Sequence, residues 1–228
     1  MSLFLGKIHY WLFNKIIWFE GLEEEIIDLA KKEGLEVANL SKEIKGRYGD
    51  RLPNIPLEDM IDKSNIHGWL QSKIHSAEGR MAAWTTELLK DEKNFSKLQK
   101  IYITQGMKAA KEAIKKGVET GTAIDIFNDM NDYILDGMPC DRVHQIIKSE
   151  EDEVKWIRRV CVHKDIWEKE NGDVERFYTL RALWIKAFVS ELNSDFIYVE
   201  NEDGSIEIKK HKRNIKTSKF KTGPLSRR

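Results

Sequence analysis

The chain has only two cysteines and no apolar run long enough to cross a membrane. Cys140 and Cys161 are too few for a disulfide framework, and no cleavable signal precedes them, which is typical of a protein in a reducing compartment. Charged and polar residues interrupt the apolar start from Leu3 to Phe19, which is also shorter than the roughly 20 residues that a span requires. The sequence therefore predicts a cytoplasmic protein without a membrane segment.

Several sequence motifs are also missing. The chain has no phosphate loop, dinucleotide fingerprint, CxxC pair, HExxH motif or nucleophile elbow, so the familiar nucleotide-binding and hydrolase classes have no support. Proline is scarce, with four residues, whereas hydrophobic residues make up 41% of the chain and charged residues 33%. This composition is that of a folded globular protein.

The formal net charge is zero, but the charge is unevenly distributed. Nine of the 38 Lys and Arg residues lie in residues 209–228, which contain no acidic residue. The rest of the chain has 29 Lys and Arg residues and 38 acidic residues, so it is acidic overall. A basic tail can bind phosphates. Nucleic-acid or membrane binding is nevertheless the less favoured interpretation, because a solvated end that docks on the acidic body explains the same pattern.

The first half of the chain shows helical periodicity. Apolar residues cover most of the circumference of a first helix from Leu3 onward, which is typical of a helix deep in a bundle or an interface. Gly and Pro between Gly46 and Pro56 indicate a loop. Further helices are predicted over residues 65–90, 95–117 and 122–136, with a short one over 141–148.

The pattern changes in the second half. Residues 154–163 alternate with period two, which predicts a strand, and a strong amphipathic helix follows over 177–192. Residues 196–210 read as a hairpin with an Asp-Gly turn. The predicted class is α+β, mostly α, with a helical bundle over 1–120, a small antiparallel sheet with a packed helix over 121–210, and a basic tail over 211–228.

One candidate site is a metal centre between helices. His67, His75 and Glu78 share one edge of the helix over 65–90, and His9 lies in the core stripe of the first helix. Histidine and carboxylate side chains that face one another across helices can hold a divalent transition metal. The alternative is that these are boundary residues that hydrogen-bond to neighbours or water.

A second candidate site is centred on cysteine. On a strand, Cys161 and His163 would point to the same face, where an imidazole can activate a thiol as a nucleophile. Cys140 and His144 repeat the pairing at helical spacing and, with Trp184 of the next helix, are candidates for ligand binding. The alternative is that the cysteines are small buried hydrophobes.

The second half also resembles a known family. The stretch EVKWIRRVC, then KDIWEKENG, then LRALWIKAFVSELNSDF is similar to the small domain of L-2-amino-thiazoline-4-carboxylic acid hydrolase-like and 4-vinyl reductase-like proteins. The resemblance covers about 90 residues and implies a small-molecule pocket with Cys161 at its mouth. The helix begins FYTLR where the family has a second cysteine, and the hairpin reads EDGSIEI without the late Cys, so ligand binding is favoured over hydrolysis.

Two classes of function therefore stay open at this stage. The first is a small-molecule-binding, hydrolase-like domain with a pocket near Cys161 and His163. The second is a non-catalytic helical protein with structural histidines, either metal-binding or a partner module. Self-association into a homo-oligomer is compatible with both.

Overall fold

The structure of the protein is a computed structural model, and it describes residues 5–211. This part of the chain is an α+β fold, mostly helical as predicted, with eight α-helices and one four-stranded antiparallel sheet. The helices are α1 (Lys7–Lys32), α2 (Val37–Tyr48), α3 (Leu57–Met60), α4 (Ile66–Leu89), α5 (Phe95–Lys115), α6 (Ala123–Asn131), α7 (Lys164–Lys169) and α8 (Val174–Leu192). The strands are β1 (His144–Glu150), β2 (Glu153–Arg158), β3 (Phe196–Glu200) and β4 (Ser205–Lys210). None of the described helices is long and apolar enough to span a membrane.

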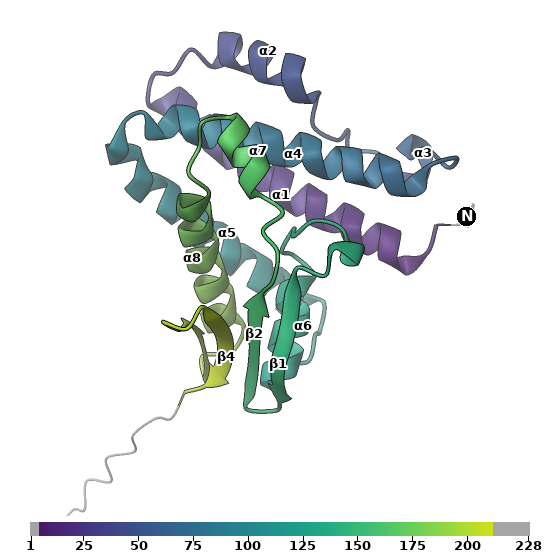
Figure 1. Ribbon diagram of the computed structural model, residues 1–228, viewed down its shortest axis with the longest axis vertical. Helices are drawn as coiled ribbons and strands as arrows, with labels where there is room; N and C mark the ends of the chain where they lie inside the picture. Colours follow the sequence, from purple (N-terminus) through teal and green to yellow (C-terminus); the bar gives the residue numbers. More distant parts are fainter. Residues whose placement is uncertain (1–4, 212–228) are drawn as a thin grey trace, which may run out of the picture.

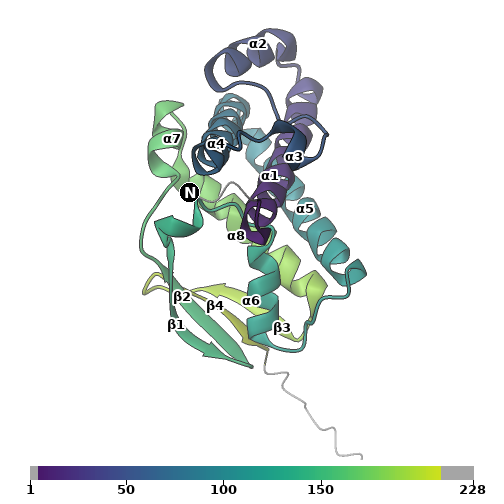
Figure 2. The ribbon, with the colours of Figure 1, turned by 90° about the vertical axis from the view of Figure 1, so that its right-hand side faces the viewer.

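The helices and the sheet occupy opposite ends of the molecule. Helices α1, α2 and α4 pack together at one end, and the sheet lies at the other end in the order β1-β2-β4-β3 (Figures 1 and 2). Helices α6 and α8 cover one face of the sheet (Figure 2). Helix α8 also lies against α5 along much of its length, so it connects the sheet to the helical end.

The contact between α5 and α8 depends on a glycine. A Cβ atom added at Gly106 of α5 would lie 2.3 Å from the backbone oxygen of Trp184 in α8. No side chain fits there, so the two helices approach closely at this point. The largest cluster of buried apolar residues draws on both predicted regions, from Leu22 of α1 to Ile208 of β4.

The inner face of the sheet follows the predicted alternation. Val154 and Trp156 of β2 are buried, and Ile208 and Ile206 of β4 pair with them across the ladder. The hairpin of β3 and β4 is as predicted, and Gly204 in its turn has φ of 78°, which glycine adopts without strain.

Three of the predicted elements differ in the structure. The short helix over 141–148 is wrong, because the chain from His144 forms β1, an edge strand that pairs with β2 through a turn at residues 151–152. The strand over 154–163 ends at Arg158, and the chain then leaves the sheet. The helix predicted over 122–136 ends earlier, at Asn131. Its start is as predicted, because the side chain of Thr122 caps the first turn.

Candidate functional site

A fully buried histidine connects three parts of the chain. His163, at the N-cap of α7, has 0% exposure. Its Nε2 lies 2.9 Å from Oδ1 of Asp136, and its Nδ1 lies 3.0 Å from Oε1 of Glu78 on α4. The contact with Glu78 is an ion pair that is not aligned as a hydrogen bond. Both ring nitrogens therefore face carboxylates.

Asp136 is the centre of this cluster. Arg181 of α8 donates to both of its oxygens, at 2.9 and 2.7 Å, and Nε2 of His144 lies 3.0 Å from Oδ2. We call Glu78, Asp136, His144, His163 and Arg181 the Asp136 cluster. With His163 protonated, two carboxylates face two cations, so the buried charges of the cluster balance.

The protonation of the cluster follows from these contacts. Burial on its own would lower the pKa of His163, but the carboxylates of Glu78 and Asp136 outweigh burial and raise that pKa to about 9. Burial would raise the pKa of Asp136, but the Arg181 guanidinium holds it well below its usual range. His163 is therefore a buried imidazolium at neutral pH, and it has no free nitrogen to act as a base.

Cys161 and His163 do not form the predicted pair. Beyond Arg158 the chain is no longer a strand, so the two side chains do not share a sheet face. The Cys161 Sγ atom is 3.1 Å from the Tyr178 hydroxyl, and no hydrogen bond joins Cys161 to His163 among the described residues. The Cys161 side chain is exposed, contrary to the interpretation as a buried hydrophobe.

The predicted ligand-binding residues Cys140, His144 and Trp184 do not lie together in one site. Cys140 is exposed, and its Sγ lies 3.8 Å from Nε2 of His67, whereas His144 belongs to the Asp136 cluster. Trp184 is buried, donates to the side chain of Gln105 at 2.9 Å and stacks on Phe188. It lines a small apolar cavity of about 30 Å³ between α1, α5 and α8, which Cys161 does not line.

The predicted metal ligands have four different environments. Among the described residues, no three His, Cys, Asp or Glu side chains converge in a way that could hold a metal ion. His9 accepts a hydrogen bond from the backbone of Gly6, His67 faces Cys140, His75 contacts Gln71, and Glu78 contacts His163. The structure thus does not bring His9, His67, His75 and Glu78 together as one centre.

A small pocket opens between α8 and the inner face of the sheet. Its lining includes Arg158, Tyr178 and Tyr198, and on its apolar side Ile185 and Ile206. The cavity volume is about 10 Å³, which is about the room that one water molecule needs. We call it the sheet pocket. His144 and Arg181 also line it, so the Asp136 cluster forms part of its wall.

Arg158 differs from the other groups in the sheet pocket. Its Nε atom is shielded from solvent and has no hydrogen-bond partner, and no described carboxylate lies within 4.0 Å of its guanidinium group. The guanidinium lies 3.4 Å from the centre of the Tyr178 ring, whose hydroxyl contacts Cys161. The pocket therefore contains a cation that no described carboxylate contacts directly, and the exposed thiol is one contact away. Glu200 also lines the pocket, where it accepts a hydrogen bond from the Tyr198 hydroxyl at 3.1 Å.

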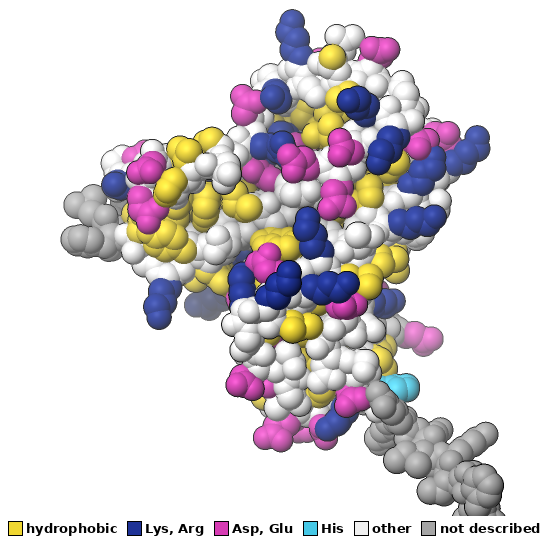
Figure 3. Space-filling model, turned by 180° about the vertical axis from the view of Figure 1, so that it is seen from behind, with side chains coloured by type: hydrophobic (Ala, Val, Ile, Leu, Met, Phe, Trp, Pro, Cys, Tyr) yellow, Lys and Arg dark blue, Asp and Glu magenta, His cyan; other side chains and the backbone are white. Residues whose placement is uncertain are grey.

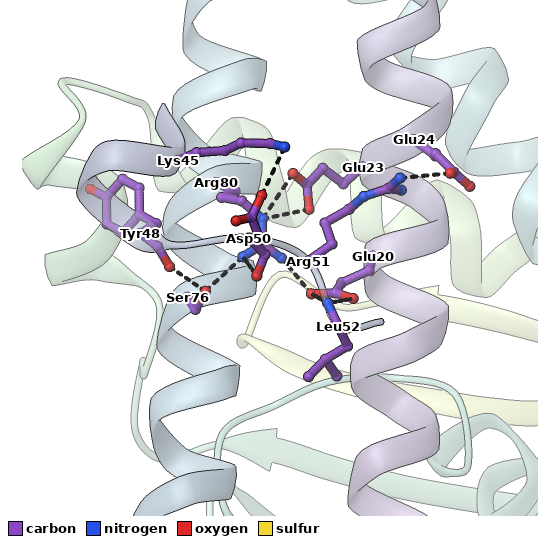
Figure 4. A network of polar contacts seen from close by, with 10 residues as sticks. All are labelled: Glu20, Glu23, Glu24, Lys45, Tyr48, Asp50, Arg51, Leu52, Ser76 and Arg80. Atoms are coloured by element: carbon purple, nitrogen blue, oxygen red, sulfur yellow. Dashed lines mark hydrogen bonds and ion pairs between the residues drawn. The ribbon is translucent and has the colours of Figure 1, made fainter. Parts of the chain in front are cut away.

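A second buried charge cluster lies between α1 and α4 (Figure 4). Nε of Arg80 lies 3.0 Å from both oxygens of Glu23, and its Nη2 contacts Glu20. Burial raises the pKa of Glu23 to about 7, because it outweighs the nearby guanidinium. Glu20 also accepts from the backbone of Leu52, so this cluster anchors the loop after α2, and we assign it a structural role.

Comparison with known proteins gives no assignment. No family model matches the chain, and neither a curated protein nor a solved structure matches it significantly. The resemblance to hydrolase-like domains thus rests on the quoted residues alone.

Sequence reasoning identified His163 and Glu78 but placed them in different sites, and it did not select Arg158 or Asp136. One signal was available for Arg158. It continues the alternation of Val154 and Trp156, which places an arginine on the buried face of the strand.

Proposed function

We propose that the protein binds a small carboxylate in the sheet pocket, with the guanidinium of Arg158 as its charge partner. The observation that carries the proposal is the shielded Nε of Arg158, which has no partner among the described residues. Burying a polar group without a hydrogen bond is unfavourable, so an anion that pairs with it is favoured.

The geometry of a guanidinium suits a carboxylate or a phosphate, and the apolar side of the pocket makes a small organic carboxylate the better match. The planar fork of the guanidinium matches the two oxygens of a carboxylate, and such pairs can be bidentate. Tyr178 and Tyr198 line the same pocket, as do apolar side chains that suit the remainder of a small organic acid. The Tyr198 hydroxyl donates to Glu200 in the structure, so it would have to exchange this partner to bind the acid. A ligand larger than water requires the pocket walls to separate, because the present cavity is small.

The proposal does not include hydrolysis by a Cys161 and His163 pair. His163 faces Glu78 and Asp136, so it cannot accept a proton from the thiol. Cys161 instead lies at the rim through its contact with Tyr178. The other class of function, a non-catalytic protein with structural histidines, is supported by the complete burial of His163.

The test is a titration of the full chain with benzoate, acetate, pyruvate and inorganic phosphate, followed by calorimetry and by tryptophan fluorescence. Trp156 lines the pocket, so we expect its emission to change on binding. Benzamide, which has the shape of benzoate without the charge, is the ligand control. We expect a carboxylate to bind and benzamide to bind at least about tenfold more weakly, because a hydrogen bond to a charged group contributes about 1.5 to 3 kcal/mol.

The variant Arg158→Gln should weaken carboxylate binding by about 10- to 100-fold. The neighbouring Arg159 is exposed and does not line the pocket, so Arg159→Gln is a matched control that should bind normally. Equal binding by the two variants would refute the role of Arg158. Binding of phosphate alone would refute the choice of carboxylate, and no binding of any anion would refute the proposed function.

A further inference from the structure

A groove runs along α1 on the side of the molecule that α5 and α6 border. It consists of two adjoining depressions of about 220 and 560 Å³, and both are lined by Ile17, Trp18 and Glu112. We call it the acidic groove. It is distinct from the sheet pocket, with which it shares no lining residue.

The acidic groove has more carboxylates than cations. Its lining contains six acidic residues and only two lysines, of which Lys116 is already paired with Glu112. Four of the carboxylates have no cation within 4.0 Å in the described part of the chain: Glu25, Asp28, Asp129 and Asp132. A positively charged occupant would supply the missing counter-charges.

Two of these carboxylates are partly desolvated. The Oδ2 atom of Asp129 is shielded from solvent and accepts no hydrogen bond from a described residue. Burial, together with Asp132 and Asp125, raises the pKa of Asp129 to about 6, and burial likewise raises the pKa of Glu25. A nearby ammonium or guanidinium group would stabilise the ionised form of both.

The walls of the groove are also suited to cations. Trp11, Trp18 and Tyr133 line it, and aromatic faces attract ammonium groups. Two lysines already make such contacts here, with Nζ of Lys15 3.6 Å from the Trp11 ring centre and Nζ of Lys116 5.6 Å from that of Tyr133. On the side of the molecule that faces away in Figure 1, hydrophobic, acidic and basic side chains are mixed (Figure 3). This face as a whole is therefore not acidic, and the attraction for a cation comes from the groove carboxylates themselves.

The end of the described chain is connected to this groove through a series of contacts. The backbone N–H of His211 donates to Asp195, and the side chain of Asn193, two residues earlier, donates to Thr120. Thr120 is two residues from Val118, which lines the groove. A short series of contacts thus links the point where residue 212 begins to one end of the groove.

The remaining 17 residues, 212–228, have the complementary chemistry. They contain seven Lys or Arg and no acid, together with the apolar residues Ile215 and Phe220. A chain of this length spans at most about 60 Å. Two hydrogen bonds and two short stretches of chain separate residue 211 from Val118 at one end of the groove, so segment 212–228 is long enough to reach it.

We propose that the acidic groove binds the basic segment 212–228 of the same chain. Its lysines and arginines pair with Glu25, Asp28, Asp129 and Asp132, and its apolar side chains contact Trp18 and Ile17. The proposal is independent of the function proposed for the sheet pocket.

The test is zero-length cross-linking of the full chain at low micromolar concentration with a water-soluble carbodiimide. The reagent activates a carboxyl group, a nearby lysine amine displaces it, and an amide bond forms while the carbodiimide leaves as a urea. Peptide mass spectrometry then locates the amide bonds. We expect monomeric products that join lysines of 212–228 to groove carboxylates, with a yield that falls sharply in 0.5 M NaCl because salt screens exposed pairs.

A charge variant tests the location. Glu25→Gln with Asp28→Asn should reduce the yield at the unchanged carboxylates Glu112 and Asp132 by about threefold, since exposed ion pairs contribute only modestly. The control is Asp165→Asn with Glu168→Gln, two exposed positions on α7, and it should leave that yield unchanged. Three results would overturn the proposal: equal yields at α7 and groove carboxylates, products only between two chains, or yields that salt and the groove variant do not change.

Discussion

Replacement of His163 by glutamine should strongly destabilise the protein, because the imidazolium is the only cation in residues 5–211 that contacts Glu78. The Glu78 side chain is 2% exposed and lies 3.0 Å from His163. In His163→Gln it would be a buried carboxylate without a cation. Breaking a buried pair by removing one partner costs about 3 to 5 kcal/mol.

The size of this loss can be separated from a general loss of packing. The total stability of a domain is about 5 to 15 kcal/mol, so the variant would lose between about a fifth and all of it. In the double variant Glu78→Gln/His163→Gln the buried charge is also removed, and we expect most of the stability to return. Recovery in the double variant would assign the loss to the charge pair.

Stability should also depend on pH in a definite direction. The pKa of His163 is raised to about 9 in the folded protein, against 6.5 for the free side chain. Its contribution is therefore complete below pH 6.5 and is lost as the pH rises through 9. The gap between wild type and His163→Gln should shrink by about 3 kcal/mol over this range. The gap is the quantity to follow, because the lowered pKa of Lys15, about 7, changes stability in the opposite sense in both proteins.

Urea denaturation followed by tryptophan fluorescence measures this directly, since Trp167 stacks on Phe177, and the Phe177 ring contacts His163. The control is His75→Gln, an exposed histidine on the same helix as Glu78, which should change stability by less than about 0.5 kcal/mol. If the two histidine variants unfold at the same urea concentration, or if the gap is constant from pH 6.5 to 9, the description of His163 as a buried imidazolium is wrong.

Two further predictions follow from the packing and the thiols. Gly106→Ala should destabilise the protein by about 1 to 3 kcal/mol in thermal unfolding, since its Cβ would lie 2.3 Å from the backbone oxygen of Trp184. Gly46→Ala, on α2 with nothing within 4 Å, should instead stabilise by about 0.5 to 1 kcal/mol, and a similar effect of the two would contradict the close approach of α5 and α8. Cys161 and Cys140 are both exposed and should both be alkylated in the native protein, with Tyr178→Phe changing the rate at Cys161 only. If the alkylation rate of Cys161 changes in folded His163→Gln but not in Tyr178→Phe, the reactivity of the thiol depends on His163 rather than on Tyr178.

The fold was predictable where periodicity was strong. Helices α4, α5 and α8 carry long apolar stripes, and the hairpin of β3 and β4 has an Asp-Gly turn, so all four features match the prediction. Helix α2 has no clear apolar periodicity in the sequence, because Ile44 is its one buried residue. Strand β1 was missed because most of its residues are exposed and its turn at residues 151–152 has neither Gly nor Asn.

The site was less predictable, because its contacts join distant parts of the chain. Glu78 and His163 are 85 positions apart, and helical periodicity shows only that Glu78 lies at the edge of a buried face. His163 was assigned to a strand that ends five residues earlier. Local patterns thus indicated that Glu78 borders a buried face but not which charge it meets there.

Arg158 has a different electrostatic environment from the two arginines that lie deepest in the structure. Arg80 is neutralised by Glu20 and Glu23, and Arg181 by Asp136, in each case through direct hydrogen bonds. These pairs agree with the rule that buried charges are paired. Arg158 is half-buried and has an aromatic ring on one side but no carboxylate, although it lines a pocket beside Arg181. The fold neutralises the other two arginines through direct contacts, whereas Glu200, which also lines the pocket, makes no ion pair with Arg158 among the described residues. We therefore propose that a bound anion pairs with Arg158, and the binding titration centres on this residue.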